Sequence, residues 1–181
     1  SVAAWGGSYG ATPSLVDDLE GSALHGKRVI AVGAGHGFSL ALADDGIVVG
    51  WGANNAGQLG DNTRDYRSIP VRVNTEAGVS ALAGKFVTGI AAGFNFGLAC
   101  CSDGTVTGWG RNVYGQLGNS SWSNASFESI VPTEADASPG SALAGKKVIS
   151  LAALWSTSFA LCSDGSIAAW GYAGHLGTNN Y

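Results

Sequence analysis

Short runs of apolar residues, each bounded by glycine or polar residues, recur along the whole chain. In the first full example the runs begin at Val29, Phe38 and Ile47 and read VIAVGAG, FSLALA and IVVGWG. Runs of this length between glycines predict β-strands. An amphipathic helix needs apolar residues at three- and four-residue spacing, and no segment keeps this spacing over a useful length. The pattern therefore predicts an all-β protein.

The runs are parts of a sequence repeat, whose clearest marker is the dipeptide Trp-Gly. The text after this dipeptide is nearly duplicated in its second and third copies, WGANNAGQLG and WGRNVYGQLG. The tryptophans of the dipeptide are Trp5, Trp51, Trp109 and Trp170. An Asp-Gly pair precedes each of the last three copies, a Gly-Lys pair stands farther upstream, and a proline separates the repeats. Markers kept in this order predict a single segment, 1–181, with repeats over 1–25 (partial), 26–83, 84–144 and 145–181 (partial).

Each repeat is expected to fold as about four short antiparallel strands. Asp-Gly between two apolar runs indicates a hairpin with a type I′ turn, in which both central residues have positive φ. Pro70 opens the run VRVN, and a proline at the start of a strand suits an edge strand, so we expect the fourth strand to be outermost. Such a unit cannot bury both of its faces alone, and radial stacking of the units predicts the blades of a β-propeller. The Trp-Gly tryptophans are expected to fill the gaps between blades.

The motif WG-x-N-x-x-GQLG, which is intact twice, resembles the regulator of chromosome condensation repeat family, as do the Asp-Gly and Gly-Lys markers. The resemblance covers nearly the whole chain and implies a β-propeller of about seven blades. About three repeats cannot close such a ring, so the chain is expected to be part of a longer propeller or to assemble with further copies. The histidine usual in the family before the Asp-Gly turn is replaced by Phe38, Phe96 and Thr157. The connectors, such as GSALAGKKV, look like those of bacterial, surface or secreted members, which implies a secreted or cell-surface protein.

Composition excludes several classes of protein. Of the 181 residues, 45% are hydrophobic and 12% are charged, which is too apolar and too weakly charged for a disordered chain. No apolar run approaches the roughly 18 residues of a membrane helix, so no membrane span is expected. Nine Lys and Arg against 13 Asp and Glu give a net charge of −4, and the cations are scattered, so no nucleic-acid partner is expected. The chain contains no methionine and opens without a leader, which suggests a processed or excerpted chain.

No residue is predicted to be catalytic or to bind a cofactor or a metal. Residues 6–10 match the G-x-S-x-G nucleophile motif, but they follow a Trp-Gly pair where the other copies have a turn. Two connectors, GSALHGK and GSALAGK, approach a phosphate-binding loop yet lack its Ser or Thr and precede a strand. The three histidines are never within metal-ligand spacing of one another or of a cysteine. The cysteines Cys100, Cys101 and Cys162 are expected to be buried free thiols.

The longest departure from the repeat, NSSWSNASFES, is the first candidate for a binding surface. It places Trp122 and Phe127 in a loop rich in Ser and Asn, where a blade needs neither ring. Loops on a rigid scaffold often carry function, and aromatic residues among small polar ones are typical of recognition surfaces. Both rings could equally pack back onto the blade edge. The segment also holds two N-glycosylation sequons, at Asn119 and Asn124.

The other loops add further candidates, including Trp155 in the turn between the first and second strands of the last repeat. Together the candidate binding residues are Arg64, Tyr66, Arg67, Tyr114, Trp122, Phe127 and Trp155. We therefore expect a non-enzymatic protein-interaction or assembly module that binds through its inter-strand loops. The partner is expected to be a protein, or further copies of the chain. The alternative is a structural surface or filament protein built by edge-to-edge association of blades. The resemblance also implies nucleotide exchange or enzyme inhibition, roles that cannot be carried over residue by residue.

Overall fold

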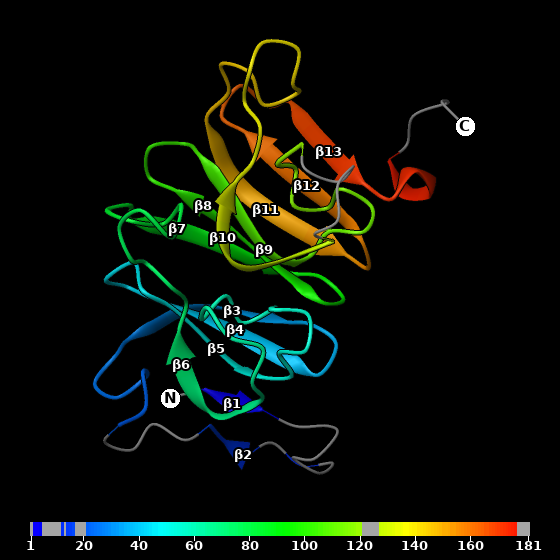
Figure 1. Ribbon diagram of the computed structural model, residues 1–181. Coiled ribbons are helices and arrows are strands. Elements are labelled where there is room, and N and C mark those ends of the chain that lie inside the picture. The colour runs from blue at the N-terminus through cyan, green and yellow to red at the C-terminus, as the bar shows by residue number, and fades with distance from the viewer. Residues whose placement is uncertain (1, 5–11, 13, 17–20, 121–126, 177–181) are drawn as a thin grey trace.

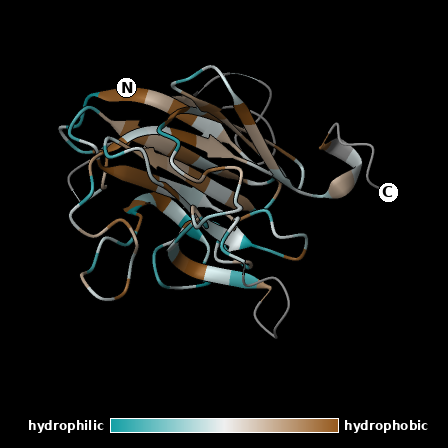
Figure 2. Cartoon of the chain, turned by 90° about the horizontal axis from the view of Figure 1, so that it is seen from above, coloured by the Kyte–Doolittle hydropathy of each residue, from teal (hydrophilic) through white to brown (hydrophobic). Residues whose placement is uncertain are grey.

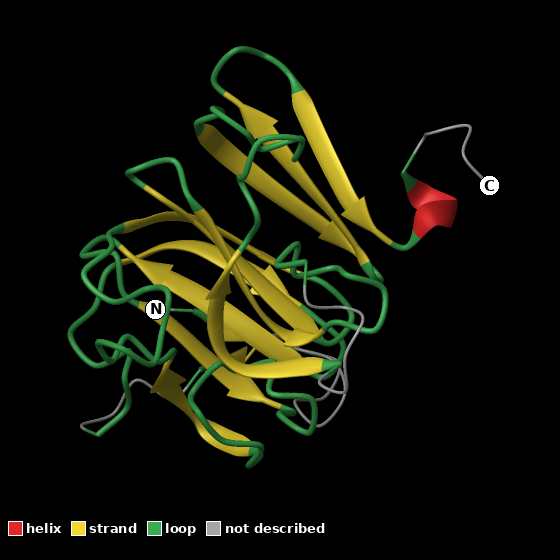
Figure 3. Cartoon of the chain, turned by 45° about the horizontal axis from the view of Figure 1, so that its top comes forward, coloured by secondary structure: helices red, strands yellow, loops and turns green. Residues whose placement is uncertain are grey.

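Antiparallel sheets account for almost all of the regular structure. The computed structural model describes residues 2–4, 12, 14–16, 21–120 and 127–176. In these residues the only helix is a 3₁₀ turn, η2 (Ala173–His175), and the remaining regular elements are strands (Figure 3). The prediction of an all-β protein is confirmed.

The strands form successive sheets in which sequence order and spatial order agree. The first four-stranded sheet consists of β3 (Val29–Ala34), β4 (Phe38–Ala43), β5 (Val48–Gly52) and β6 (Arg67–Arg72). The second consists of β7 (Val87–Ala92), β8 (Phe96–Cys101), β9 (Val106–Arg111) and β10 (Glu128–Glu134). A three-stranded sheet follows, with β11 (Val148–Leu154), β12 (Thr157–Cys162) and β13 (Ile167–Gly171). At the N-terminal end β1 (Ala3–Ala4) pairs with β2 (Ser14–Leu15).

The sheets stand side by side as blades of a β-propeller (Figure 1). The first strands are innermost, because β3 lies against β7 and β7 lies against β11. The fourth strands β6 and β10 form the outer edges of their sheets. The expected blade of four antiparallel strands with the fourth outermost is thus confirmed.

The hydrophobic core lies between neighbouring blades. One buried cluster joins β4 to Val87, Ala99 and Trp109 of the next blade. A second cluster joins Cys100 and Val106 to residues of the third sheet. Apolar residues accordingly concentrate on the stacked strands, and polar residues on the surrounding loops (Figure 2). Each blade therefore needs its neighbour to bury its faces.

The Asp-Gly pairs form hairpin turns as predicted, but the predicted type I′ geometry is wrong. Positive φ occurs at the glycine alone, as at Gly46 (φ 81°), and not at the preceding aspartate. Gly46 N–H donates to the Ala43 carbonyl (3.0 Å) and Ala43 N–H donates to the Ile47 carbonyl (2.9 Å). This is a three-residue loop, with a type I turn followed by a glycine bulge. The Asp45 carboxylate favours it by accepting a hydrogen bond from Ile47 N–H (3.2 Å).

The expectation that Pro70 opens the fourth strand is also wrong. Pro70 lies inside β6, and Pro132 lies inside β10. The pairing of both strands with their neighbours shifts register at this point, so no ladder hydrogen bond from the proline is required. The proline carbonyls accept hydrogen bonds from Ala23 N–H (3.0 Å) and Ala81 N–H (2.9 Å). Each fourth strand is thereby tied to a connector segment.

Candidate interaction face

The turns and loops of the blades collect at two opposite ends of the sheets. At one end the turn between the first and second strands meets the loop after the third strand, and Ala53 N–H donates to the Gly37 carbonyl (2.8 Å). We call this end the loop face. At the other end the Asp-Gly turn meets the connector between blades, and Asp44 N–H donates to the Arg28 carbonyl (2.9 Å). We call this end the connector face. Both bonds recur in the next two blades.

The polar residues that repeat in the signature motif hold the loops of the loop face from inside. Asn54 Oδ1 accepts a hydrogen bond from Leu59 N–H (2.9 Å), and Gln58 Oε1 accepts one from Ala56 N–H (2.8 Å). Both side chains are buried, and the second copy of the motif makes the equivalent bonds. These residues fold the loop and have no free group for a ligand.

Two of the Trp-Gly tryptophans, Trp109 and Trp170, join one blade to the next, as predicted. Trp109 is fully buried, and its indole Nε1–H donates to the Gln58 carbonyl of the preceding blade (2.9 Å). Trp170 makes the same bond to Gln116 (2.9 Å). The duplicated text Trp-Gly and Gly-Gln-Leu-Gly is therefore a structural contact between blades.

Three planar side chains, one from each turn between first and second strands, are stacked across the loop face. The ring centroids of His36 and Phe94 are 4.2 Å apart at 15°, and those of Phe94 and Trp155 are 5.3 Å apart at 8°. His36 N–H donates to the Phe94 carbonyl, and Phe94 N–H donates to the Trp155 carbonyl, both at 2.9 Å. We call His36, Phe94 and Trp155 the aromatic ladder.

Trp155 is an exposed member of the ladder and lies where the sequence predicted, in the turn between the first and second strands. It is 63% exposed, although Phe94 stacks on its ring. Its φ of 51° is unfavourable for a residue with a large side chain. Strain of this kind concentrates at functional sites. His36 and Phe94 were not predicted, yet each stands two residues before the start of the second strand, as Trp155 does.

Three more of the predicted binding residues present exposed rings on the loop face. Tyr66 is 62% exposed, Phe127 51% and Tyr114 49%. The Tyr114 ring meets Tyr172 edge to face, with centroids 5.1 Å apart, and both line an open cavity of about 440 Å³. Tyr172, which directly follows the last Trp-Gly pair, was not predicted. The predicted Trp122 lies outside the described residues.

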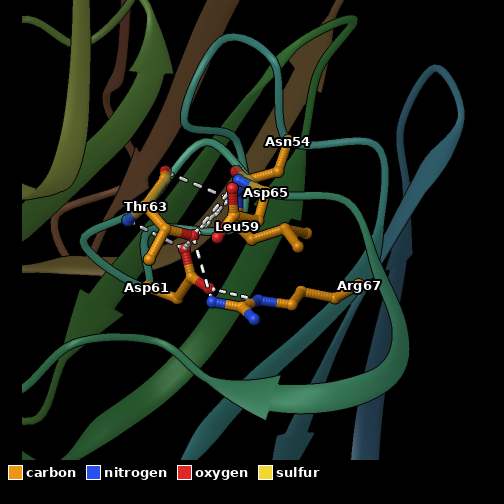
Figure 4. A network of polar contacts seen from close by, with 6 residues as sticks. All are labelled: Asn54, Leu59, Asp61, Thr63, Asp65 and Arg67. Atoms are coloured by element: carbon orange, nitrogen blue, oxygen red, sulfur yellow. Dashed lines mark hydrogen bonds and ion pairs between the residues drawn. The ribbon is translucent and has the colours of Figure 1, made fainter.

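The two predicted arginines of this face are already engaged within the protein. Arg64 forms an ion pair with Glu128 of the next blade and donates to the Asn55 carbonyl (3.0 Å). Arg67 Nε donates to Asp61 Oδ2 (2.8 Å) in the network of Figure 4. Both side chains therefore shape the loop that presents Tyr66.

Asp61 is the centre of that network. Its carboxylate accepts hydrogen bonds from Asn54 (3.0 Å) and from the Thr63 hydroxyl (2.7 Å), in addition to Arg67 (Figure 4). Burial raises the pKa of Asp61, but the hydrogen bonds from Thr63, Arg67 and Asn54 outweigh burial and lower the pKa below its ordinary value. The carboxylate is therefore ionised across the neutral range and holds Arg67 in place.

The predicted glycosylation sites fall in the matching loop of the second blade. Asn119 Nδ2, the atom that would carry a glycan, donates to Thr133 Oγ1 (3.1 Å), and Asn119 Oδ1 accepts from Asn112 (3.1 Å). Asn119 thus occupies the position of Asp61 in the first blade. The second sequon, at Asn124, lies outside the described residues.

The three cysteines lie at the ends of β8 and β12, next to the Asp-Gly turns rather than on the loop face. The three cysteines are buried free thiols, as predicted. Burial raises the pKa of Cys100, and raises that of Cys101 to about 11.

Within the described ranges, no three His, Cys, Asp or Glu side chains are grouped so that they could hold a metal ion. The G-x-S-x-G match at residues 6–10 lies outside the described residues. No helix in the described part of the chain is long and apolar enough to cross a membrane.

Sequence profiles of the regulator of chromosome condensation (RCC1) repeat match residues 29–58, 87–116 and 45–100. Among curated proteins, the chain is 36% identical over 147 residues to the mitochondrial RCC1 domain-containing protein RUG3 of Arabidopsis thaliana. The match covers 80% of this chain and 29% of RUG3. Because RUG3 is mitochondrial, the expectation of a secreted or cell-surface protein is wrong.

Solved structures show the same fold. Human WBSCR16 is 29% identical, with a TM-score of 0.70 over 81% of this chain and 34% of that protein. Prp20p of Saccharomyces cerevisiae is 24% identical, with a TM-score of 0.64 over 84% of this chain and 35% of Prp20p. The chain thus spans about a third of the length of each of these three proteins.

Proposed function

This chain belongs to the regulator of chromosome condensation repeat family, and we propose that it is a non-enzymatic module that binds a partner protein through the loop face. The observation that carries the proposal is the gathering of exposed rings there. Tyr66, Tyr114, Phe127 and Trp155 come from three separate loops, and all lie at the same end of the blades. Trp and Tyr are the residues that most often dominate the energetics of protein interfaces.

The rigidity of the loop face supports the same conclusion. Asn62 N–H donates to the Ile130 carbonyl (3.0 Å), so the loop that carries Tyr66 is fixed to the next blade. The ladder fixes Trp155 in the same way. Rings held in place before binding lose little conformational entropy when a partner arrives. Prp20p, which shares the fold, has binding properties towards Gsp1p and histones, so this fold can serve protein binding.

The test is retention of proteins from an extract of the source organism on the immobilised chain. A variant with Trp155→Ala and Tyr66→Ala should lose the specifically retained proteins, on the order of tenfold or more, because such anchors contribute about 2 kcal/mol or more each. The control variant carries Arg28→Ala and Lys147→Ala, two exposed residues of the connector face. Equal retention by the loop-face variant and the control would refute the proposal.

Association through blade edges is the second candidate. No described strand pairs with the outer side of β13, and Ile167 on that strand is 72% exposed. A free edge with exposed apolar residues favours pairing with another strand. Light scattering coupled to chromatography tests this candidate, since edge association predicts a mass that rises with concentration and falls in an Ile167→Lys variant. A monomer at all concentrations would exclude it.

A further inference from the structure

The Gly-Lys and Asp-Gly markers, which the sequence shows as separate features, meet in space on the connector face. Lys27 forms an ion pair with Asp45, and Lys146 forms one with Asp164. In the middle blade Lys85 Nζ lies 3.4 Å from Asp103 Oδ2. Each lysine therefore covers the aspartate of the hairpin turn in its own blade.

An Asp-Gly bond in an exposed turn is chemically fragile. The glycine nitrogen can attack the aspartate side-chain carbon Cγ, where an N–Cγ bond forms, the Cγ–OH bond breaks, and the hydroxyl and the N–H proton leave together as one water molecule. Water then adds to either carbonyl of the resulting succinimide ring and restores aspartate or gives isoaspartate. Glycine offers no side chain to hinder the attack. The reaction needs a free glycine nitrogen and is fastest with a protonated carboxyl.

The turns of this protein offer neither a free glycine nitrogen nor a protonated carboxyl. Gly165 N–H is engaged with the Cys162 carbonyl (3.0 Å), and the other two turns make the equivalent bond. Asp164 Oδ1 accepts hydrogen bonds from Ser166 N–H (3.0 Å) and Ser166 Oγ–H (2.6 Å), while Oδ2 faces Lys146. Both carboxylate oxygens are therefore already engaged by partners other than the glycine nitrogen.

The same contacts keep the carboxylates ionised. The hydrogen bond from Lys146 is the main cause that lowers the pKa of Asp164, and the hydrogen bond from Lys27 is the main cause for Asp45. For Asp103 the hydrogen bond from the Thr105 hydroxyl contributes most, and Lys85 contributes less. An ionised carboxylate is a poor target for the glycine nitrogen, because oxide is a worse leaving group than water.

We propose that Lys27, Lys85 and Lys146 are positioning residues that protect the three Asp-Gly bonds, each of which becomes a site of isoaspartate formation when its lysine is absent. The outcome matters for the blade, because isoaspartate inserts an extra methylene into the backbone between the second and third strands. The turn fixes the register of a hairpin. An extra methylene in the turn therefore disturbs the pairing of the two strands that the turn connects. The lysine that repeats in each blade thus protects the hairpin turns from isoaspartate formation.

The experiment compares the full chain with Lys146→Ala and Lys147→Ala variants during prolonged incubation at neutral pH. Lys147 is exposed, adjacent in sequence, and forms none of the described ion pairs. Peptide mass spectrometry, together with enzymatic methylation of isoaspartyl carboxyls, measures each turn separately. We expect a several-fold faster rise of isoaspartate at Asp164 in Lys146→Ala alone, with Asp45 and Asp103 of the same molecules unchanged.

Two results would overturn the proposal. One is an unchanged rate at Asp164 in Lys146→Ala, or an equal rise in the Lys147→Ala control. The other is a rise at all three turns, which would show that the variant loses its fold rather than a local contact. In a Lys146→Arg variant, which keeps the positive charge, Asp164 should isomerise at the wild-type rate. That result would exclude a general effect of substitution at position 146.

Discussion

The glycine of each of the last three Trp-Gly pairs is required by the backbone around it. Gly110 has a φ of 93°, and a Cβ on it would lie 2.5 Å from the Asn95 carbonyl oxygen. Gly52 and Gly171 face the same obstacle at 2.4 and 2.3 Å. The loop after the third strand must approach the neighbouring turn this closely to make the hydrogen bonds of the loop face. The glycine of the Trp-Gly marker is therefore a steric requirement of the fold.

Gly110→Ala should lower the free energy of unfolding by about 3 kcal/mol or more, because it combines backbone strain with a clash. The matched control is Gly140→Ala. Gly140 has a similar φ of 103° but open space around its Cβ position, so only strain of about 1–2 kcal/mol is expected. Denaturant unfolding measures both, and equal losses would contradict the role given to the close approach.

A second residue-scale prediction concerns the Asp61 network. The pKa of Asp61 is lower in the folded protein than its ordinary value of 3.8, so ionised Asp61 stabilises the fold above about pH 4. That contribution is lost as the pH falls through the lowered pKa. Asp61→Asn should therefore cost about 1–2 kcal/mol at neutral pH, and the difference from wild type should shrink in acid.

The matched control for this change is Asp65→Asn, an exposed carboxylate in the same loop. Asp65→Asn should change the free energy of unfolding by only a few tenths of a kcal/mol. Urea titrations at several pH values decide the matter. If the difference in free energy of unfolding between wild type and Asp61→Asn stayed constant into acid, the carboxylate charge would not be what stabilises the loop.

At the scale of elements, strand positions were readable from the sequence but the details of the turns were not. The starts predicted at Val29 and Phe38 are those of β3 and β4, since local apolar patterning determines them. The turn type at Asp45 depends on where its carboxylate finds donors. The position of Pro70 depends on a register shift against β5. Both are set by tertiary contacts that no local pattern encodes.

The candidate site was predictable in part for the same reason. Aromatic residues in loops rich in polar residues indicated Tyr66, Phe127 and Trp155, and all three are exposed. The sequence could not show that Arg64 pairs with Glu128, because the two are 64 residues apart and meet only when blades stack. The ladder was missed because it needs three repeats aligned at one turn position.

The contact between blades gives an element-scale prediction. Trp109→Phe keeps an aromatic ring but leaves the buried Gln58 carbonyl without its indole donor. We expect a loss of about 2 kcal/mol or more in unfolding free energy, from the unpaired carbonyl and the lost volume together. Trp155→Phe, at an exposed position, should change it by only a few tenths. Similar losses in both variants would contradict the structural role of Trp109.

At the scale of the whole molecule, the two ends of the propeller differ in how many exposed aromatic rings they carry. The connector face holds ion pairs in all three blades, formed by Lys27, Lys85 and Lys146 with their turn aspartates. The loop face holds the aromatic ladder and the exposed tyrosines. Charged pairs in water contribute little to binding, whereas preorganised aromatic rings contribute much. This difference supports the proposal that the loop face, rather than the connector face, binds a partner.

The most direct test of this account is site-specific photo-crosslinking, with the same reactive amino acid placed either at Tyr66 or at Arg28. The first position lies on the loop face and the second on the connector face. The account predicts a discrete cross-linked partner from position 66 alone, which disappears when excess unlabelled chain competes but persists when the competitor carries Trp155→Ala. Cross-linking of the same partner from position 28, or equal competition by the Trp155→Ala chain, would contradict the assignment of the loop face as the binding surface.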